Sequence, residues 1–293
     1  MKFLISAFFA SCLTGAAIDF EKLIPATTLR IDQNFTSDFD RGGELGSTQA
    51  RLRSFTNQPL RFGDDWVLVN YLQYDFTRLD LAGASPFAAL SDELEGGLHR
   101  LALPLTLIHA PAESHWMSGL WLNPTFASGT SGLDADQFFL DLGAGFSYKY
   151  SENLMLGLGL YASDFTEDFG LVIGPGFVWT PGDDWLVSYF GPRFLTRYSF
   201  SEKTQLGFEI ATRGGRWAIE DGGQSRKLNL RNWQSGLYLR HNFHEELWLQ
   251  LGAGYSFARQ LEVSERNGDD LAGGKQDLDG SPYFYLSLDI ASW

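Results

Sequence analysis

Cysteine, histidine and methionine are scarce in this chain, whose 293 residues include one Cys, five His and three Met. The single cysteine, Cys12, excludes an intramolecular disulfide framework and any metal site built from several thiolates. Long apolar runs are missing too: none after residue 17 approaches the roughly 20 residues of a transmembrane helix. The sequence therefore predicts neither a disulfide-stapled domain nor a helical membrane protein.

Basic residues are outnumbered, with 22 Lys and Arg against 36 Asp and Glu and a formal net charge of −14. A nucleic-acid partner requires a basic face that neutralises phosphates. This charge balance argues against nucleic acid as a partner.

The first 17 residues have the three parts of a secretory signal peptide. Lys2 supplies the cation, residues 3–13 the apolar core, and residues 14–17 the small-residue exit. We expect cleavage after Ala17, which leaves residues 18–293 as one exported domain. The alternative is a lipoprotein box at residues 9–12, with Cys12 as the lipidated residue.

Period-two alternation recurs along the mature chain and predicts β-strands. In residues 138–149, 154–161 and 247–258, Leu, Phe and Tyr alternate with Gly, Ser, Gln and isolated charges. Each segment has about 10–13 residues, which is the length of a tilted transmembrane strand and about twice that of most soluble strands.

The two faces of these segments differ in polarity. One face is an apolar stripe suited to lipid, and the other is small and polar, as the lumen of a membrane barrel is. Aromatic residues make up 15% of the chain, and interfacial girdles place Trp at strand ends. We expect girdle positions at Trp66, Trp116, Trp179, Trp185 and Trp248.

Connection lengths predict the topology. Short turns are expected at residues 63–65, 109–115, 151–153, 181–184, 201–203 and 244–246, and longer loops near residues 39–48, 82–97, 128–136, 213–227 and 264–280. Short periplasmic turns and longer extracellular loops are typical of outer-membrane barrels. If the chain also reverses at Gly191-Pro192, it forms an all-β, transmembrane, antiparallel up-and-down β-barrel of 14 strands, with 12 strands as the alternative.

Short motifs in the C-terminal two-thirds resemble a known family. The stretch FGPRFLTRYSFSEK at residues 190–203, LGFE at 206–209, LRNWQSGL at 230–237 and GAGYSFAR at 252–259 are similar to a bacterial outer-membrane β-barrel family known only as a domain of unknown function. The resemblance implies a fold and an outer-membrane location, and it carries no activity.

Charged residues at inward-facing positions are the candidate functional residues. A charge facing lipid at mid-bilayer costs about 2–4 kcal/mol for Arg or Lys, so these side chains are expected to line the lumen. The candidates are Arg193, Arg197, Glu209, Arg240, Asp141 and Lys149, with Arg51, Arg53 and Asp75 in the same class. Two readings stay open, because charged rings can select ions in a pore or form ion pairs that fill a closed lumen.

Catalytic and metal-binding patterns are weak. Of the five histidines only His99 is expected near the long loops, and it lacks a Ser or Asn partner by pattern. We interpret His241 and His244 as solvated turn residues. The acidic loop at residues 267–280 lacks the spacing of an EF-hand calcium site. We predict no enzyme activity, no cofactor and no metal.

Three functions therefore remain. The first is a passive channel for small solutes or ions, and the second is a non-conducting structural or surface-recognition barrel acting through its external loops. A barrel enzyme is the third. The expected partners are outer-membrane lipid and the outer-membrane assembly machinery, for which Trp293 supplies a C-terminal aromatic.

Overall fold

The computed structural model describes residues 25–291 except 57–58, 84–86, 88–89, 91–93, 95, 130–136, 164–170, 222 and 266–268. The predicted signal peptide, Cys12 and Trp293 lie outside the described residues. None of the described residues belongs to a helix that is long and apolar enough to cross a membrane.

Seventeen strand segments follow one another along the chain. They are β1 (Thr27–Asp38), β2 (Glu44–Phe55), β3 (Leu60–Phe62), β4 (Trp66–Ala82), β5 (Leu98–Ala102), β6 (Leu105–His109), β7 (Trp116–Ser128), β8 (Phe138–Lys149), β9 (Leu154–Ser163), β10 (Leu171–Trp179), β11 (Trp185–Phe190), β12 (Arg193–Ser201), β13 (Thr204–Asp221), β14 (Gln224–His244), β15 (Leu247–Glu265), β16 (Asp270–Leu278) and β17 (Ser281–Ile290).

Three pairs of segments act as single interrupted strands. The segments β2 and β3 both pair with β4, β5 and β6 both pair with β7, and β16 and β17 both pair with β15. The wall of the barrel therefore has 14 strands, each antiparallel to its neighbours, and the predicted fold is confirmed.

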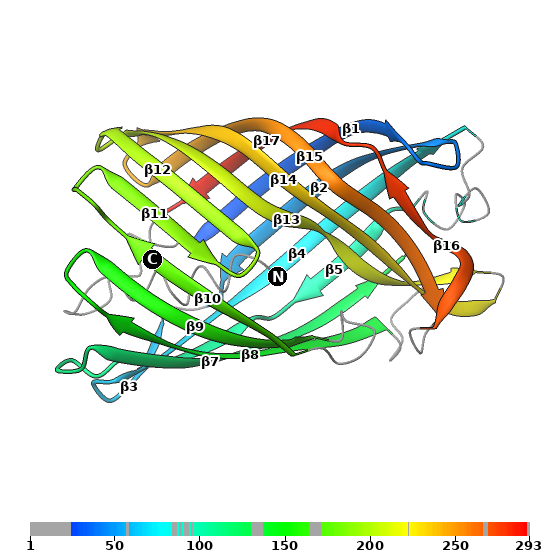
Figure 1. Cartoon of the computed structure of the whole chain (residues 1–293). Helices are drawn as coiled ribbons and strands as arrows, with labels where there is room; N and C mark the ends of the chain where they lie inside the picture. The colour runs from blue at the N-terminus through cyan, green and yellow to red at the C-terminus, as the bar shows by residue number, and fades with distance from the viewer. Residues whose placement is uncertain are drawn as a thin grey trace.

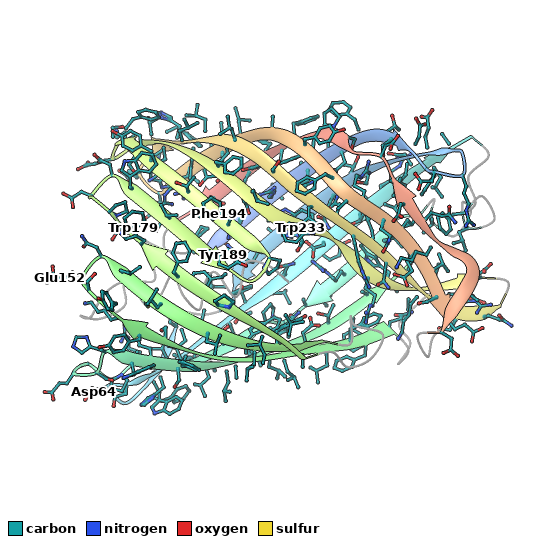
Figure 2. The ribbon with its side chains drawn as sticks, viewed as in Figure 1. Asp64, Glu152, Trp179, Tyr189, Phe194 and Trp233 are labelled. Carbon is teal, nitrogen blue, oxygen red and sulfur yellow. The ribbon has the colours of Figure 1, made fainter. Side chains whose placement is uncertain are left out.

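The ring closes between the first and last strands, where Thr27 of β1 stands opposite Ile290 of β17 (Figure 1). Ile290 also pairs with Leu247, at the turn between β14 and β15. Both described ends of the chain thus lie at the end of the barrel that carries the short turns, as predicted. Asp64 and Glu152, in two of these turns, lie at that same end in Figure 2.

The reversal at Gly191-Pro192 is present and fixes the strand count. Phe190 of β11 pairs with Arg193 of β12, so only two residues form the turn. Gly191 has φ +50°, and a glycine with positive φ at the first central position is typical of a type II′ hairpin. The even number of strands in the barrel therefore depends on this turn.

Large apolar side chains cover the outside of the barrel, with Leu120, Leu237 and Phe284 more than 45% exposed. Four of the predicted girdle tryptophans, at positions 66, 116, 179 and 185, are also exposed near the short turns. The prediction of Trp248 as a girdle residue was wrong. The guanidinium of Arg240 lies 4.2 Å from the centre of the Trp248 ring. Because Trp248 alternates with the outward-facing Leu247 and Leu249, it belongs to the inner face.

Three strands are longer than predicted, since β13, β14 and β15 have 18, 21 and 19 residues. The expected loop at residues 213–227 is a strand hairpin in which Asp221 pairs with Gln224. Most of residues 264–280 is strand as well, and residues 44–48 begin β2. These loop predictions were wrong because glycines and charged residues interrupt the apolar pattern in this part of the sequence. The inward apolar residues Trp217 and Ile219 on β13, and Leu228 and Leu230 on β14, therefore did not indicate strands.

The extended part of β13 stays paired with β14 but loses its other neighbour, β12. Its pairing with β12 ends at Ala211, and it then forms a parallel bridge from Ala218 to Ser128 of β7. The backbone N–H of Gly129 donates to the carbonyl of Ala218 at 3.0 Å. At its loop end the barrel is therefore closed by a contact between β7 and β13.

A β-bulge in β15 changes which residues face inward. Trp233 pairs with Phe257, but Arg231 pairs with Gln260, so β15 has one extra residue there. Ala258 has φ +46° and is exposed, although alternation placed it in the lumen. The bulge shifts the phase of the strand and turns Leu261 and Val263 inward.

Candidate functional site

Buried charges form a belt on the inner face of the barrel wall. Arg51 and Arg100 both bind the carboxylate of Asp75, the latter from Nε at 2.7 Å. On β1, Nε of Arg30 donates to both oxygens of Asp32 at 2.9 and 3.0 Å. All five side chains are at least 90% buried. Each strand places them on alternate residues, so they all face inward.

Two of the predicted residues meet in this belt. Nε of Arg193 lies 2.8 Å from Oε1 of Glu209 on the next strand, and Nη2 of Arg213 lies 3.2 Å from the same oxygen. These ion pairs connect β12 with β13 on the inner face of the barrel.

Two further predicted arginines lie nearer the short turns. Arg240 stands 3.5 Å from Oδ2 of Asp289 and donates from Nη1 to Gln205 at 3.3 Å. Arg197, two inward positions from Arg193 on β12, is half-buried and makes no ion pair with the described residues. Arg197 thus differs from Arg193 and Arg240, each of which pairs with a carboxylate.

The structure does not bring the last two candidates into the same cluster. Asp141 accepts hydrogen bonds from Asn123 at 2.9 Å and Tyr161 at 3.0 Å, on the wall formed by β7, β8 and β9. Lys149 ends β8 beside a short turn, where its backbone N–H donates to His115. Lys149 therefore belongs to the rim of the barrel and not to the belt.

Several residues of the belt were missing from the predicted set. Arg30 and Asp32 alternate with the exposed Leu29 and Ile31, which is the signal that identifies them. Arg213 was overlooked because the sequence placed it in a loop. Alternation was enough for the first two, whereas Arg213 required knowing how far β13 extends.

The belt and its surroundings carry an excess of positive charge. Its arginines are Arg30, Arg51, Arg53, Arg100, Arg193, Arg197, Arg213 and Arg240, and its carboxylates are Asp32, Asp75, Asp141, Glu209 and Asp289. Eight cations thus face five anions, although the whole chain has a net charge of −14. The inner face around the belt is therefore more positive than the overall charge suggests.

The loop end of the lumen is filled by an apolar cluster, called here the outer cluster. It includes Phe87, Leu90 and Leu94 from the segment between β4 and β5, each no more than 5% exposed. These side chains pack with inward residues of the wall such as Trp217 and Leu228. The segment between β4 and β5 therefore contributes side chains that close the barrel at this end.

Two paired glycines lie on the inner face of β9 and β10. Gly159 of β9 pairs with Gly174 of β10, and a Cβ atom added at either would meet no side chain of the described residues within 4 Å. By contrast, Cβ atoms added at Gly207 and Gly252 would overlap the rings of Tyr238 and Tyr285. Tyrosine rings thus cover Gly207 and Gly252, whereas no described side chain covers Gly159 or Gly174 within that distance.

Two of the histidines, His99 and His241, have a hydroxyl group as side-chain partner. His99 lies on the outward face of β5, where its Nδ1 is 2.7 Å from the hydroxyl of Tyr74. Nδ1 of His241 is 2.9 Å from the hydroxyl of Thr204. Within the described ranges, no three His, Cys, Asp or Glu residues are grouped so that they could hold a metal ion.

Comparison with known proteins gives a family and several structural likenesses. Residues 98–291 match the family model described as "Domain of unknown function (DUF6268)". No curated protein matches the chain.

Solved structures similar to this chain include the COG4313 outer membrane channel from Pseudomonas putida F1, with 15% identity, a TM-score of 0.48 and coverage of 91% of this chain and 95% of that one. The NanC porin has 7% identity, a TM-score of 0.42 and coverage of 90% and 99%. The toluene transporter TodX of Pseudomonas putida has 12% identity, a TM-score of 0.35 and coverage of 93% of both chains.

Proposed function

Because the chain belongs to the family described as "Domain of unknown function (DUF6268)", no activity comes with its family, and we propose one from the lumen: a gated outer-membrane channel for small solutes or ions. In this proposal the short turns face the periplasm and the outer cluster faces the outside of the cell. The channel performs no catalysis.

The pair of glycines at positions 159 and 174, which no described side chain covers within 4 Å, is the observation that carries this proposal. Glycine in the interior of a strand lowers stability by roughly 0.5–1 kcal/mol relative to alanine. A barrel selected only for rigidity has no need to leave the inner side of two paired glycines uncovered. A wall without side chains is expected where a solute passes.

The outer cluster supports the gating part of the proposal. Phe87, Leu90 and Leu94 come from a connection between strands and not from the wall itself. Connections of this kind move more readily than paired strands. Withdrawal of these three side chains would open the loop end while the 14-strand wall stays intact.

The excess of arginine in the belt supports a preference for anions. Rings of Arg and Lys favour anions in pores, and Arg197 faces the lumen without an ion-pair partner among the described residues. Six of the other belt arginines pair with a carboxylate: Arg30, Arg51, Arg100, Arg193, Arg213 and Arg240. We assign Arg197 the largest share of this preference.

A non-conducting structural barrel is the second candidate function. It is favoured by the ion pairs of Asp75 and Glu209, each of which binds two arginines. Such pairs rigidify a lumen without any solute passing through it. On this alternative the external loops would contact the partner.

Conductance of the refolded protein in a planar bilayer distinguishes the two candidates. We would compare the unaltered chain with a variant carrying Phe87→Ser, Leu90→Ser and Leu94→Ser. The matched control is Leu60→Ser, an exposed position near the short turns. A heat-dependent mobility shift on a gel would verify that each variant is folded.

The proposal predicts brief or rare openings of the unaltered chain and long openings of the triple variant, with no change in the control. If the folded triple variant never conducts, the channel is wrong and the structural barrel is the better reading. Conductance that is equal in all three proteins would remove the outer cluster as the gate.

A further inference from the structure

One side of the inner face is apolar toward the short turns. Inward residues of β4, β6, β7, β9, β10 and β11 form a buried group there, called here the inner cluster. Its members are Val67, Val69, Tyr71, Ile108, Trp121, Met155, Val178 and Phe190. Residues next to them in sequence, such as Trp66, Leu120 and Leu156, are exposed on the outer face. Because the interior of a membrane barrel is usually polar, an apolar stretch of this size on the inner face requires a separate explanation.

The other side of the inner face carries charge. The strands β12, β13, β14 and β17 place Arg197, Glu209, Arg240 and Asp289 at inward positions. The two carboxylates already pair with other arginines or with Arg240. Arg197 is partly exposed and makes no ion pair with the described residues. Its charge is therefore available to a molecule in the lumen.

The apolar side and the charged side meet between β11 and β12. Leu186 of β11 stands directly opposite Arg197 of β12. Directly opposite residues of antiparallel strands have their side chains on the same face, with Cβ atoms about 4.5–5.5 Å apart. Leu186 packs against the inner cluster, and both it and Arg197 are partly exposed. One small molecule is thus able to contact the edge of the inner cluster and a cation without a carboxylate partner.

This juxtaposition narrows the chemistry of such a molecule. A neutral apolar solute at this place would remove water from Arg197 without supplying an opposite charge, which is unfavourable. A small hydrated anion would leave Leu186 and the inner cluster uncovered. An organic anion satisfies both sides, because its carboxylate forms charge-assisted hydrogen bonds with a guanidinium and its apolar body buries surface against Leu186.

We propose that the boundary between β11 and β12 binds small organic anions with an apolar body, such as aromatic carboxylates. In this site Arg197 holds the carboxylate and Leu186, at the edge of the inner cluster, contacts the apolar body. The proposal rests on the proposed channel, for which it names the substrate class.

Fluorine NMR of the full-length protein labelled with 5-fluorotryptophan tests the site without requiring conduction. The chain has nine Trp, and Trp121→Phe identifies the resonance of Trp121, in the inner cluster, by its loss. The probe is sodium benzoate. Sodium acetate has the charge without the apolar body, and benzamide has the apolar body without the charge.

Two substitutions separate the two halves of the site. Arg197→Gln removes the charge, and its matched control is Arg78→Gln, at an exposed position. Leu186→Ser removes apolar surface, and its matched control is Leu60→Ser, which is also exposed. Each titration is repeated in the triple serine variant of the outer cluster, so that a closed loop end cannot hide the site.

We expect benzoate to shift the Trp121 resonance in a saturable way and to bind at least about tenfold more tightly than acetate or benzamide. Arg197→Gln should weaken benzoate binding roughly tenfold and Leu186→Ser roughly fivefold, with little change in the two controls. If Leu186→Ser does not fold, Arg197→Gln and the comparison of benzoate with acetate decide the question.

A shift that does not saturate, or equal affinity in the site variants and their controls, would overturn the site and leave the inner cluster as packing alone. Saturable binding by a protein that never conducts in a planar bilayer would keep the site and reject the channel. Conduction without benzoate binding would keep the channel and reject organic anions as its substrate class.

Discussion

Nε of Arg193 lies 2.8 Å from Oε1 of Glu209, so that the first residue after the β11–β12 turn is tied to β13. The same carboxylate holds Arg213 of β13. The tip of the β11–β12 hairpin is thus anchored by charge near the point where β13 stops pairing with β12.

Replacing Glu209 with Gln should strongly destabilise the barrel. The substitution leaves Arg193 and Arg213 without their shared carboxylate, and breaking a buried ion pair costs about 3–5 kcal/mol. Urea unfolding in lipid vesicles, followed by tryptophan fluorescence, measures the loss. The control is Asp80→Asn, which breaks an exposed pair with Arg78 and should cost under about 1 kcal/mol. Equal losses would contradict the structural role given to the belt.

Replacing Arg197 with Gln should reduce the preference for anions. We expect the ratio of anion to cation permeability to fall roughly twofold, because the charge of Arg197 is not offset by a neighbouring carboxylate. The reversal potential under a KCl gradient measures this ratio. Arg193→Gln should have a smaller effect, and Lys149→Gln at the rim should have the smallest. The reverse order would show that selectivity lies elsewhere.

Adding a side chain at Gly159 should lower the conductance without unfolding the protein. In Gly159→Val the nearest atom to the new Cβ is a backbone oxygen at 3.8 Å, and valine suits a strand better than glycine does. Stability should therefore hold or rise, while single-channel conductance falls. Gly207→Val is the contrast, because its side chain would overlap Tyr238 and should cost about 1–3 kcal/mol. Unchanged conductance in folded Gly159→Val would place the solute path elsewhere.

An arginine introduced on the outward face should lower the unfolding free energy more, the deeper its position lies in the membrane. Leu237 and Phe243 are both outward-facing and exposed on β14, but Phe243 lies beside a short turn. Leu237→Arg should lose about 2–4 kcal/mol of unfolding free energy in lipid vesicles, and Phe243→Arg about 0–1 kcal/mol. The comparison needs only urea titrations of two variants. Similar losses at both positions would mean that Leu237 lies outside the hydrocarbon region.

The fold could be predicted because its signal repeats in every strand. Alternation at residues 138–149 and 154–161 assigned both faces, and Gly191-Pro192 gave the extra turn that makes the count 14. What alternation cannot show is a local change of phase. Ala258 interrupts β15 with a bulge, and from there on the inward residues follow from the register of the partner strand alone.

The candidate site was predicted in part, for a related reason. Arg193 and Glu209 were assigned to adjacent strands on the same face, and the structure pairs them. Arg213 was missed because β13 continues through a segment rich in glycine and charge. The outer cluster could not be predicted either, since nothing in the sequence near Phe87 or Leu90 indicates that a connecting segment packs inside a barrel.

The contact between Ala218 and Ser128 gives the barrel two perimeters. The end that carries the loops, called here the mouth, is encircled by β1, β2, β4, β5, β7, β13, β14, β15 and β16. The middle of the barrel, called here the waist, also includes β8 to β12. Because diameter grows roughly with strand number, the mouth has about two-thirds of the girth of the waist. Mutations near Gly191 can therefore reshape the waist independently of the mouth, so evolution can alter what the barrel holds separately from what it admits.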